Sequence, residues 1–280
     1  MLTVANHDRD LAGLTYVYPV LSRRAGGVSV GINLNPNDAC NWRCAYCQVP
    51  NLVRGKAPKI DLARLEDELR GFLVALVQGD WLAHNAPADA RTLKDIAFSG
   101  NGEPTSAAEF ADAVTLAARL RDEFAPGVPL RLISNGSLLG QARVREGIRR
   151  LAAARGEVWF KVDAGDAAAI ARINGVKLTP RTLARHLAAC AALCPTWVQT
   201  CVFRWDGAPA TSSEVERYLD VLAHAGDGGG KLAGVLLYGV ARPPTLPEGA
   251  HVGAATAADF TRIEARIKEK GLTRTIRVSP

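Results

Sequence analysis

Three cysteines stand close together in one short segment of this 280-residue chain. Cys40, Cys44 and Cys47 have the spacing Cys-x3-Cys-x2-Cys, directly after a strand-like run over 28–34. So short a segment cannot point all three thiols into a core, but it can curl the sulfurs around one metal centre. Thiolates are the ligands that hold iron–sulfur clusters. Three thiolates against four irons would leave one iron open to a reactant, so the spacing favours a reactive iron–sulfur site.

Two other interpretations of the thiols stay open. Soft thiolates also bind zinc, but a closed zinc site needs a fourth ligand, and no histidine lies near the loop in the sequence. A disulfide would pair two thiols and leave the third. The remaining cysteines are Cys190 and Cys194, at apolar positions of a helix expected from 180, and Cys201 in the next strand. Their positions favour a core role, with an auxiliary cluster as the alternative.

The cysteine spacing, with Tyr46 directly before the last cysteine, resembles the signature of the radical S-adenosylmethionine enzymes. The resemblance implies a [4Fe–4S] cluster on Cys40, Cys44 and Cys47, whose open iron binds the amino and carboxylate groups of S-adenosylmethionine. It also implies that one electron from the reduced cluster cleaves the sulfonium, giving methionine and a 5′-deoxyadenosyl radical that abstracts a hydrogen from a substrate. A flavodoxin or ferredoxin would supply that electron.

Further polar residues come directly after expected strands. The turn Asn101-Gly102-Glu103 is similar to the Gly-Gly-Glu turn with which this family holds the methionine amino group, with Asn101 in place of the first glycine. The resemblance therefore assigns that role to Gly102 and Glu103, and the alternative is a plain turn with an exposed glutamate. Asn135 lies in an Asn-Gly turn of a kind that the family also has, so it becomes a cofactor candidate.

A strand expected over 158–163 carries two charges on one face, Lys161 and Asp163. Charges on a strand fit for burial are costly unless they pair or meet a polar ligand, and we favour ligand contact over an ion pair. The resemblance implies that Asp163 meets the ribose hydroxyls and Lys161 the methionine carboxylate. It places Tyr46 and the backbone near Tyr238 and Gly239 beside the adenine.

Two residues are candidates for substrate contact. Gln199 lies on the same strand face as Cys201 and could contact the substrate. The alternative is that its amide is buried in the core and hydrogen-bonded to other protein groups. Arg242 precedes two stiff prolines and could grip an anionic group or cap the barrel.

Two classes of substrate are considered for this enzyme. The runs 98–104 and 172–175 resemble the iron–sulfur oxidoreductases that include the tRNA wyosine-forming enzymes, but those enzymes carry further cysteines where this chain has none before Cys40. RNA modification is therefore one branch, and a small anionic molecule or peptide is the other. A zinc-binding adaptor without catalysis is the alternative from a different class.

Composition limits the class of protein. Apolar residues make up 48% and charged residues 22%, which is ordinary for a globular protein. No apolar run approaches the roughly 20 residues that span a bilayer, and the first residues lack the apolar core of a signal peptide. We therefore expect a cytoplasmic protein without a membrane partner. The net charge of +6 would suit an anionic substrate or RNA.

The elements that must position these residues follow a regular order. Six expected strands alternate with helices from 28 to 270, which predicts an α/β fold with a partial (β/α)6 barrel of parallel strands. Residues 1–27 would add an N-terminal β-hairpin extension, and 271–280 a tail or edge strand, within a single domain over 1–280. Ser106 and Glu109 predict a capping box for the helix after the Glu103 turn. The site candidates lie at the carboxyl ends of strands, where parallel α/β folds bind ligands.

Overall fold

The structure is a computed structural model, and it describes residues 2–3, 13–22, 26–226, 232–271 and 276–279. The chain forms two compact units. The first contains 1–41, 55–133 and 141–157, and the second contains 42–54, 134–140 and 158–280. The prediction of a single domain stays a prediction, and each unit is described by itself.

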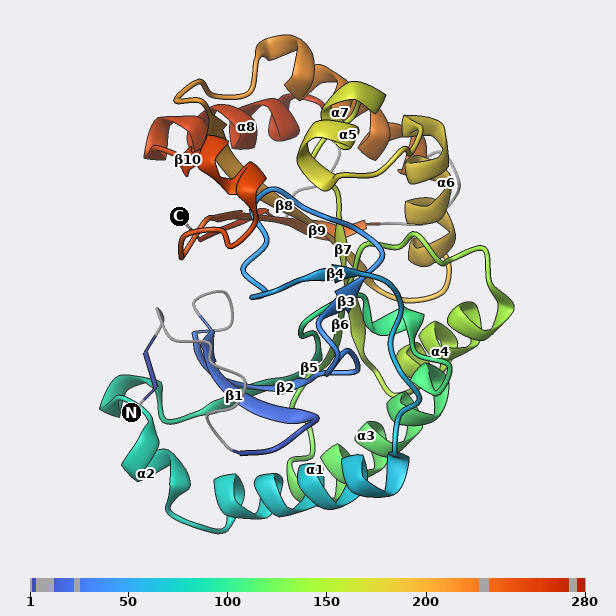
Figure 1. Ribbon diagram of the computed structural model, residues 1–280, viewed down its shortest axis with the longest axis vertical. Coiled ribbons are helices and arrows are strands. Elements are labelled where there is room, and N and C mark those ends of the chain that lie inside the picture. Colours follow the sequence, from blue (N-terminus) through green and yellow to red (C-terminus); the bar gives the residue numbers. More distant parts are fainter. Residues whose placement is uncertain (1, 4–12, 23–25, 227–231, 272–275, 280) are drawn as a thin grey trace. The chain divides into compact units, whose positions relative to one another are not determined.

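Parallel strands form the sheet of the first unit, with a hairpin at its edge (Figure 1). The strand order is β1-β2-β5-β6. β1 and β2 pair antiparallel, which confirms the predicted hairpin, and β2, β5 and β6 run parallel. The strands, with the short β3, are β1 (Val17–Ser22), β2 (Gly27–Ile32), β3 (Ala39–Cys40), β5 (Leu93–Phe98) and β6 (Leu130–Ser134).

Helices with one apolar stripe pack in this unit, α1 against α3 and α3 against α4. Asp61 caps α1 as predicted, since its carboxylate accepts the backbone N–H of Arg64 at 3.1 Å. The predicted capping box is wrong. Glu109 makes no capping bond, and the Ser106 hydroxyl instead accepts the backbone N–H of Ala57 at 2.9 Å. The helices are α1 (Leu62–Val77), α2 (Trp81–Asn85), α3 (Phe110–Phe124) and α4 (Ala142–Ala153), with short 3₁₀ turns η1 (Ala88–Ala90) and η2 (Pro104–Ser106).

The second unit repeats the pattern of parallel strands and covering helices. Its strand order is β7-β8-β9-β11, and β10 pairs antiparallel with β8. The register sets Lys161 beside Gln199 and Cys201 beside Tyr238. The strands, with the short β4, are β4 (Val53–Arg54), β7 (Glu157–Lys161), β8 (Thr196–Trp205), β9 (Leu232–Gly239), β10 (Val252–Ala254) and β11 (Ile276–Ser279).

One helix of this unit, α5, is absent from the sequence-based expectation. Its cap is Asp166, whose side chain accepts the N–H of Ala169, and it ends at Gly175 in the left-handed conformation that glycine favours. The helices are α5 (Ala167–Asn174), α6 (Pro180–Ala191), α7 (Ser212–Gly226) and α8 (Ala257–Glu269), with the turn η3 (Pro247–His251).

The alternation of mostly parallel strands with helices confirms the predicted α/β class. All six predicted barrel strands are present, as β2, β5, β6, β7, β8 and β9, within a few residues of the expected bounds. Among the described residues, no helix has the length and apolar character needed to cross a bilayer.

Candidate cofactor site

The three loop cysteines are all half-buried, and none forms a disulfide. Cys40 ends β3 in the first unit, whereas Cys44 and Cys47 belong to the second. In the described parts of the chain, no three Cys, His, Asp or Glu side chains converge on a point where one metal ion could sit. A zinc knot requires such convergence, whereas the thiolates of an iron–sulfur cluster bind different irons and stand farther apart.

Segments distant in sequence hold the second half of the cysteine loop. On one side, two backbone N–H groups of the loop donate to carbonyl groups at the end of α5. Arg43 donates to Asn174 at 3.0 Å, and Ala45 donates to Ile173 at 2.7 Å. On the other side the backbone N–H of Thr245 donates to the carbonyl of Cys47 at 2.9 Å. These main-chain bonds fix the path of the loop from 43 to 47.

Asp163, just past β7, is the centre of a hydrogen-bond network beside Cys44. Its carboxylate accepts the Tyr46 hydroxyl, the Asn174 amide at 2.8 Å and the backbone N–H of Cys201 at 3.0 Å. The Asn174 amide also lies 3.5 Å from the sulfur of Cys44. The network therefore ties the aromatic residue of the loop and one of its thiols to the end of β7.

Lys161 lies within this network. Its ammonium is 4.7 Å from the centre of the Tyr46 ring and donates to the Tyr238 hydroxyl at 3.3 Å. Burial would lower the pKa of Lys161, but Tyr238, Asp163 and Cys44 raise it, and the net pKa is above its ordinary value. Lys161 thus carries a positive charge at neutral pH, and it faces the same side of the sheet as Gln199.

Burial also changes the acidity of the loop residues. It raises the pKa of the Cys44 thiol to about 11, although Lys161 opposes the shift. Burial, followed by the charge of Asp163, raises the pKa of Tyr46 well above its usual range. Tyr46 is therefore a neutral donor to Asp163. The Cys44 thiol would have to lose its proton on binding a metal.

In the first unit, the Gly102–Glu103 turn packs against the chain leading to Cys40. A Cβ on Gly102 would lie 2.1 Å from the carbonyl oxygen of Ala39, so only glycine allows this approach. Glu103 is 2% exposed, and its carboxylate accepts the hydroxyl of Thr105 at 2.6 Å. A buried carboxylate suits a cationic ligand group, because an opposite charge offsets part of the cost of its burial.

The other candidate residues are placed as follows. Asn135 is buried, and its side-chain oxygen accepts the N–H of Ser137 at 3.0 Å. Gly239 ends β9 next to Tyr238. Gln199 is 1% exposed, and neither polar atom of its amide has a hydrogen-bond partner among the described residues. The guanidinium of Arg242 donates to the side chain of Gln48.

The sequence-based reasoning missed two residues of this region. Asn174 holds both Asp163 and Cys44, and the only sequence signal for it is its place in the 172–175 run. Gln48 follows Cys47 directly, and its amide donates to the backbone carbonyl of Arg242 at 2.8 Å. Cys190 and Cys194 are buried at 0% and 3% exposure, in line with a core position.

The donor set fits the group that the cysteine spacing implies. Three thiols suit an iron–sulfur cluster. The buried carboxylate of Glu103 and the half-buried ammonium of Lys161 have the charges that pair with the two charged ends of an amino acid. The site residues therefore agree in chemistry with a cluster and S-adenosylmethionine.

Comparison with known proteins gives partial relatives. The UPF0026 protein MJ1312 of Methanocaldococcus jannaschii is 30% identical over 148 residues, which are 53% of this chain and 40% of that protein. A GTPase Obg of Brachyspira hyodysenteriae is 26% identical over 127 residues, 45% of this chain and 16% of that protein. The chain thus spans less than half the length of either relative.

A solved structure shares the fold. The structure of histidine-tagged anSMEcpe with bound AdoMet superposes with a TM-score of 0.52, at 17% identity, over 89% of this chain and 64% of that chain. This likeness agrees with the predicted partial barrel. A sequence model of the Radical SAM superfamily matches residues 34–222, which include the cysteine loop, the Glu103 turn and the Asp163 network. Since this match covers more than half of the chain, the protein belongs to the radical SAM superfamily, whose members use a [4Fe–4S] cluster and S-adenosylmethionine.

Proposed function

We propose that this protein is a radical S-adenosylmethionine enzyme. When bound, the cluster and S-adenosylmethionine supply reductive cleavage of the sulfonium and, from it, abstraction of a hydrogen atom from the substrate. The observation that carries the proposal is the network in which Asp163 joins Tyr46 to Asn174 beside the Cys44 thiol. Such a network fixes a ligand loop in one geometry before any ligand binds.

The residues take the following roles in this proposal. Cys40, Cys44 and Cys47 bind the cluster. Gly102 and Glu103 receive the methionine amino group, because a buried carboxylate pairs with an ammonium. Other residues meet the remaining parts of the cofactor: Lys161 the methionine carboxylate, Asp163 the ribose hydroxyls, and Tyr46, Asn135, Tyr238 and Gly239 the rest of the nucleoside.

Asp163 can accept a ribose hydroxyl in addition to the hydrogen bonds that it receives from the protein. An ionised carboxylate offers about four acceptor positions, and three are taken by protein donors. The same residue would thus orient Tyr46 and accept a hydroxyl. No side chain acts as a general base in this scheme, and the protein positions the ligands and excludes water.

The function is tested by anaerobic reconstitution with iron and sulfide, followed by dithionite and S-adenosylmethionine. We expect about four irons per chain and formation of 5′-deoxyadenosine. Cys44→Ala should abolish the product, and Cys190→Ala, a buried cysteine of α6 outside the loop, should keep both the iron and the product. Product from Cys44→Ala would refute the assignment, and a colourless protein rich in zinc would favour the adaptor.

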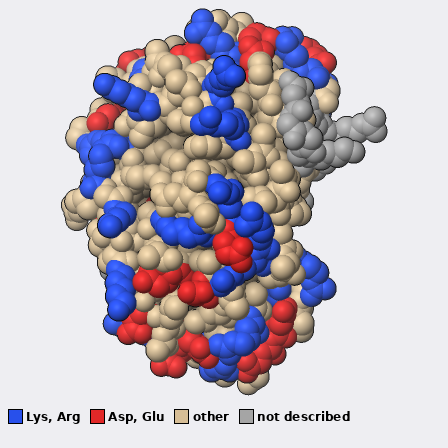
Figure 2. Space-filling view, turned by 90° about the vertical axis from the view of Figure 1, so that its right-hand side faces the viewer, with Lys and Arg blue, Asp and Glu red and all other residues tan. Residues whose placement is uncertain are grey.

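The electron donor and the substrate belong to the proposal as well. A flavodoxin or ferredoxin should replace dithionite in the assay. On the face shown in Figure 2, Lys and Arg side chains predominate across the middle, and Asp and Glu side chains lie among them mainly in the lower part. RNA-binding proteins usually gather basic residues on one face, and the Lys and Arg residues are scattered along this sequence, so we take a small molecule or peptide as the substrate. Gel-shift binding to bulk tRNA at physiological salt would overturn that choice.

A further inference from the structure

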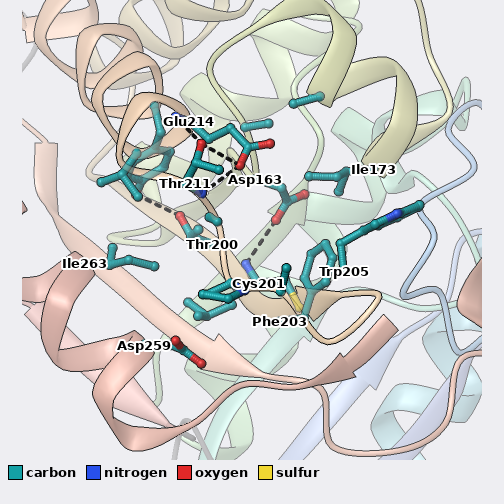
Figure 3. Close-up of a pocket in the computed structure, with 18 of the residues that line it drawn as sticks. Asp163, Ile173, Thr200, Cys201, Phe203, Trp205, Thr211, Glu214, Asp259 and Ile263 are labelled. Atoms are coloured by element: carbon teal, nitrogen blue, oxygen red, sulfur yellow. Dashed lines mark hydrogen bonds between the residues drawn. The ribbon is translucent and has the colours of Figure 1, made fainter. Parts of the chain in front are cut away.

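A cavity of about 240 Å³ lies in the second unit, between β8 and the helices α5, α7 and α8. Figure 3 shows Ile173 of α5 and Ile263 of α8 on opposite sides of it, with Thr200 of β8 between them in this view. Most of its lining is apolar, and Val202 and Val215 complete that surface. An apolar cavity of about 150 Å³ already accommodates benzene, so this space is large enough for a ring with a substituent.

The cavity adjoins the cofactor network at β8, but neither Lys161 nor Tyr46 is among the residues that line it. Thr200 shares a hydrogen bond of 2.8 Å with the hydroxyl of Tyr218 on α7, which places its side chain on the helix-facing side of the strand. Gln199 and Cys201 alternate to the opposite side, where Lys161 and Tyr238 are their register partners. A ligand in the cavity therefore need not displace Lys161 or Tyr46. Asp163 and Cys201, whose backbone N–H donates to that carboxylate, belong to the network and also line the cavity.

Three carboxylates and two guanidiniums line the cavity, and each of the carboxylates has a cationic neighbour in the lining or just outside it. Glu214 pairs with Arg172 at 2.7 Å, and Asp259 pairs with Arg204 at 2.9 Å. Asp163 lies beside the positive Lys161. The guanidinium of Arg262 donates to the backbone carbonyl of Ala210 at 2.6 Å and, among the described residues, forms no ion pair with a carboxylate. Within the part of the chain that the structure describes, the lining thus offers one cation without a carboxylate partner in a mostly apolar space.

A guanidinium with spare donors forms two parallel hydrogen bonds with a carboxylate. A phosphate dianion would bring a second negative charge into a mostly apolar space that has only one unpaired cation. A neutral ligand would leave the positive charge of the guanidinium without a counter-charge, and an ammonium ligand would be repelled by it. We propose that this cavity binds a small apolar carboxylic acid, its hydrocarbon part among Ile173, Val202 and Ile263 and its carboxylate on Arg262.

Titration calorimetry on the full-length protein tests the proposal, with benzoate as the probe and benzyl alcohol and benzylammonium as matched ligands. Benzoate should bind with a dissociation constant of about 1 mM or tighter, as expected for a ligand of this size. It should bind at least about tenfold tighter than benzyl alcohol, because a hydrogen bond to a charged group is worth more than one to a neutral group. Arg262→Gln should remove that preference. Arg217→Gln changes the net charge equally outside the cavity and should leave the preference intact.

Two further measurements locate the bound probe. Ala169→Leu should fill part of the cavity and abolish binding of benzoate and benzyl alcohol together. Should that variant fail to fold, benzoate should still change the fluorescence of the wild type, and Trp205→Phe should lose the change, since Trp205 lines the cavity. Saturating S-adenosylmethionine should not compete with benzoate.

Three results would overturn the proposal. They are the absence of benzoate binding to the wild type, an unchanged preference for benzoate over benzyl alcohol in Arg262→Gln, and displacement of benzoate by S-adenosylmethionine. The titrations with benzoate and the variants need neither the cluster nor the cleavage reaction, and they therefore stand or fall independently of the proposed function. Only the competition with S-adenosylmethionine depends on binding of that cofactor.

Discussion

Substitution of Gly102 by alanine should destabilise the protein and lower its capacity for the cluster. The new Cβ would lie 2.1 Å from the carbonyl oxygen of Ala39 and 2.6 Å from the side chain of Asn35. Ordinary contacts between carbon and oxygen are about 3.3 Å or longer, so the chain before Cys40 must move by about 1 Å. The Asn35 amide holds that chain by donating to the Ala39 carbonyl at 2.9 Å, and this bond would be strained or lost.

The cost follows from these contacts. Overpacking of a well-filled site costs about 1–3 kcal/mol, and a lost hydrogen bond adds about 1 kcal/mol. We therefore expect Gly102→Ala to lower the free energy of unfolding by about 2–4 kcal/mol, a large share of the roughly 5–15 kcal/mol typical of a domain. Because the displaced peptide joins Ala39 to Cys40, the iron content after reconstitution should fall too.

Urea unfolding followed by circular dichroism under anaerobic conditions measures the first effect, and iron analysis measures the second. Gly71→Ala is the matched control, because a Cβ at that position of α1 meets nothing within 4 Å. It should stabilise the helix by up to about 1 kcal/mol. If Gly102→Ala unfolds within about 0.5 kcal/mol of the wild type, the close approach to Ala39 is not a constraint and our reasoning is refuted.

Three other substitutions test the second unit. Asn174→Ala removes the hydrogen bonds to Asp163 and to the Cys44 thiol. Formation of 5′-deoxyadenosine should therefore fall, while the iron content is largely kept. An unchanged amount of product would contradict a positioning role of Asn174. Gly136→Ala should cost about 2–4 kcal/mol in urea unfolding, since its φ is 67° and its Cβ would meet a phenylalanine ring. The hydrogen bond from Arg204 is the chief reason that the pKa of Asp259 is lowered to about 2. The ionised carboxylate therefore stabilises the fold above a pH of about 4, and this contribution is lost as the pH falls towards about 2. Asp259→Asn should therefore cost up to about 2 kcal/mol at pH 7, reduced by solvent screening, and the difference from the wild type should close in acid; a constant difference would exclude the ion pair as its source.

The strands and most helices could be predicted from the sequence, because hydrophobic periodicity reports directly which faces are buried. β8 and α1 are examples, since each has a long pattern and α1 has a side-chain cap. The short helix α5 could not be predicted in this way. Its eight residues are rich in alanine and show no extended stripe, so what defines it is its capping residue and its packing.

The site could be predicted only in part. The cysteine spacing identified the loop, and alternation placed Lys161 and Asp163 at the end of the same strand. The partners of Asp163 were out of reach, since Tyr46 lies 117 residues away in sequence and Cys201 lies 38 residues away. Similarly, Ser106 looked like a helix cap, because local spacing cannot show that its hydroxyl is taken by Ala57, 49 residues earlier.

The main-chain bonds around the cysteine loop set an order of events during biosynthesis. Residues 43–47 leave the ribosome well before their partners at 173, 174 and 245. Since domains fold as their segments become available, the thiols would stay exposed and poorly oriented until residue 245 has been translated. Iron and sulfide should therefore enter only after that point, and a chain that stops before residue 245 should accumulate without metal even when cluster-assembly factors are abundant.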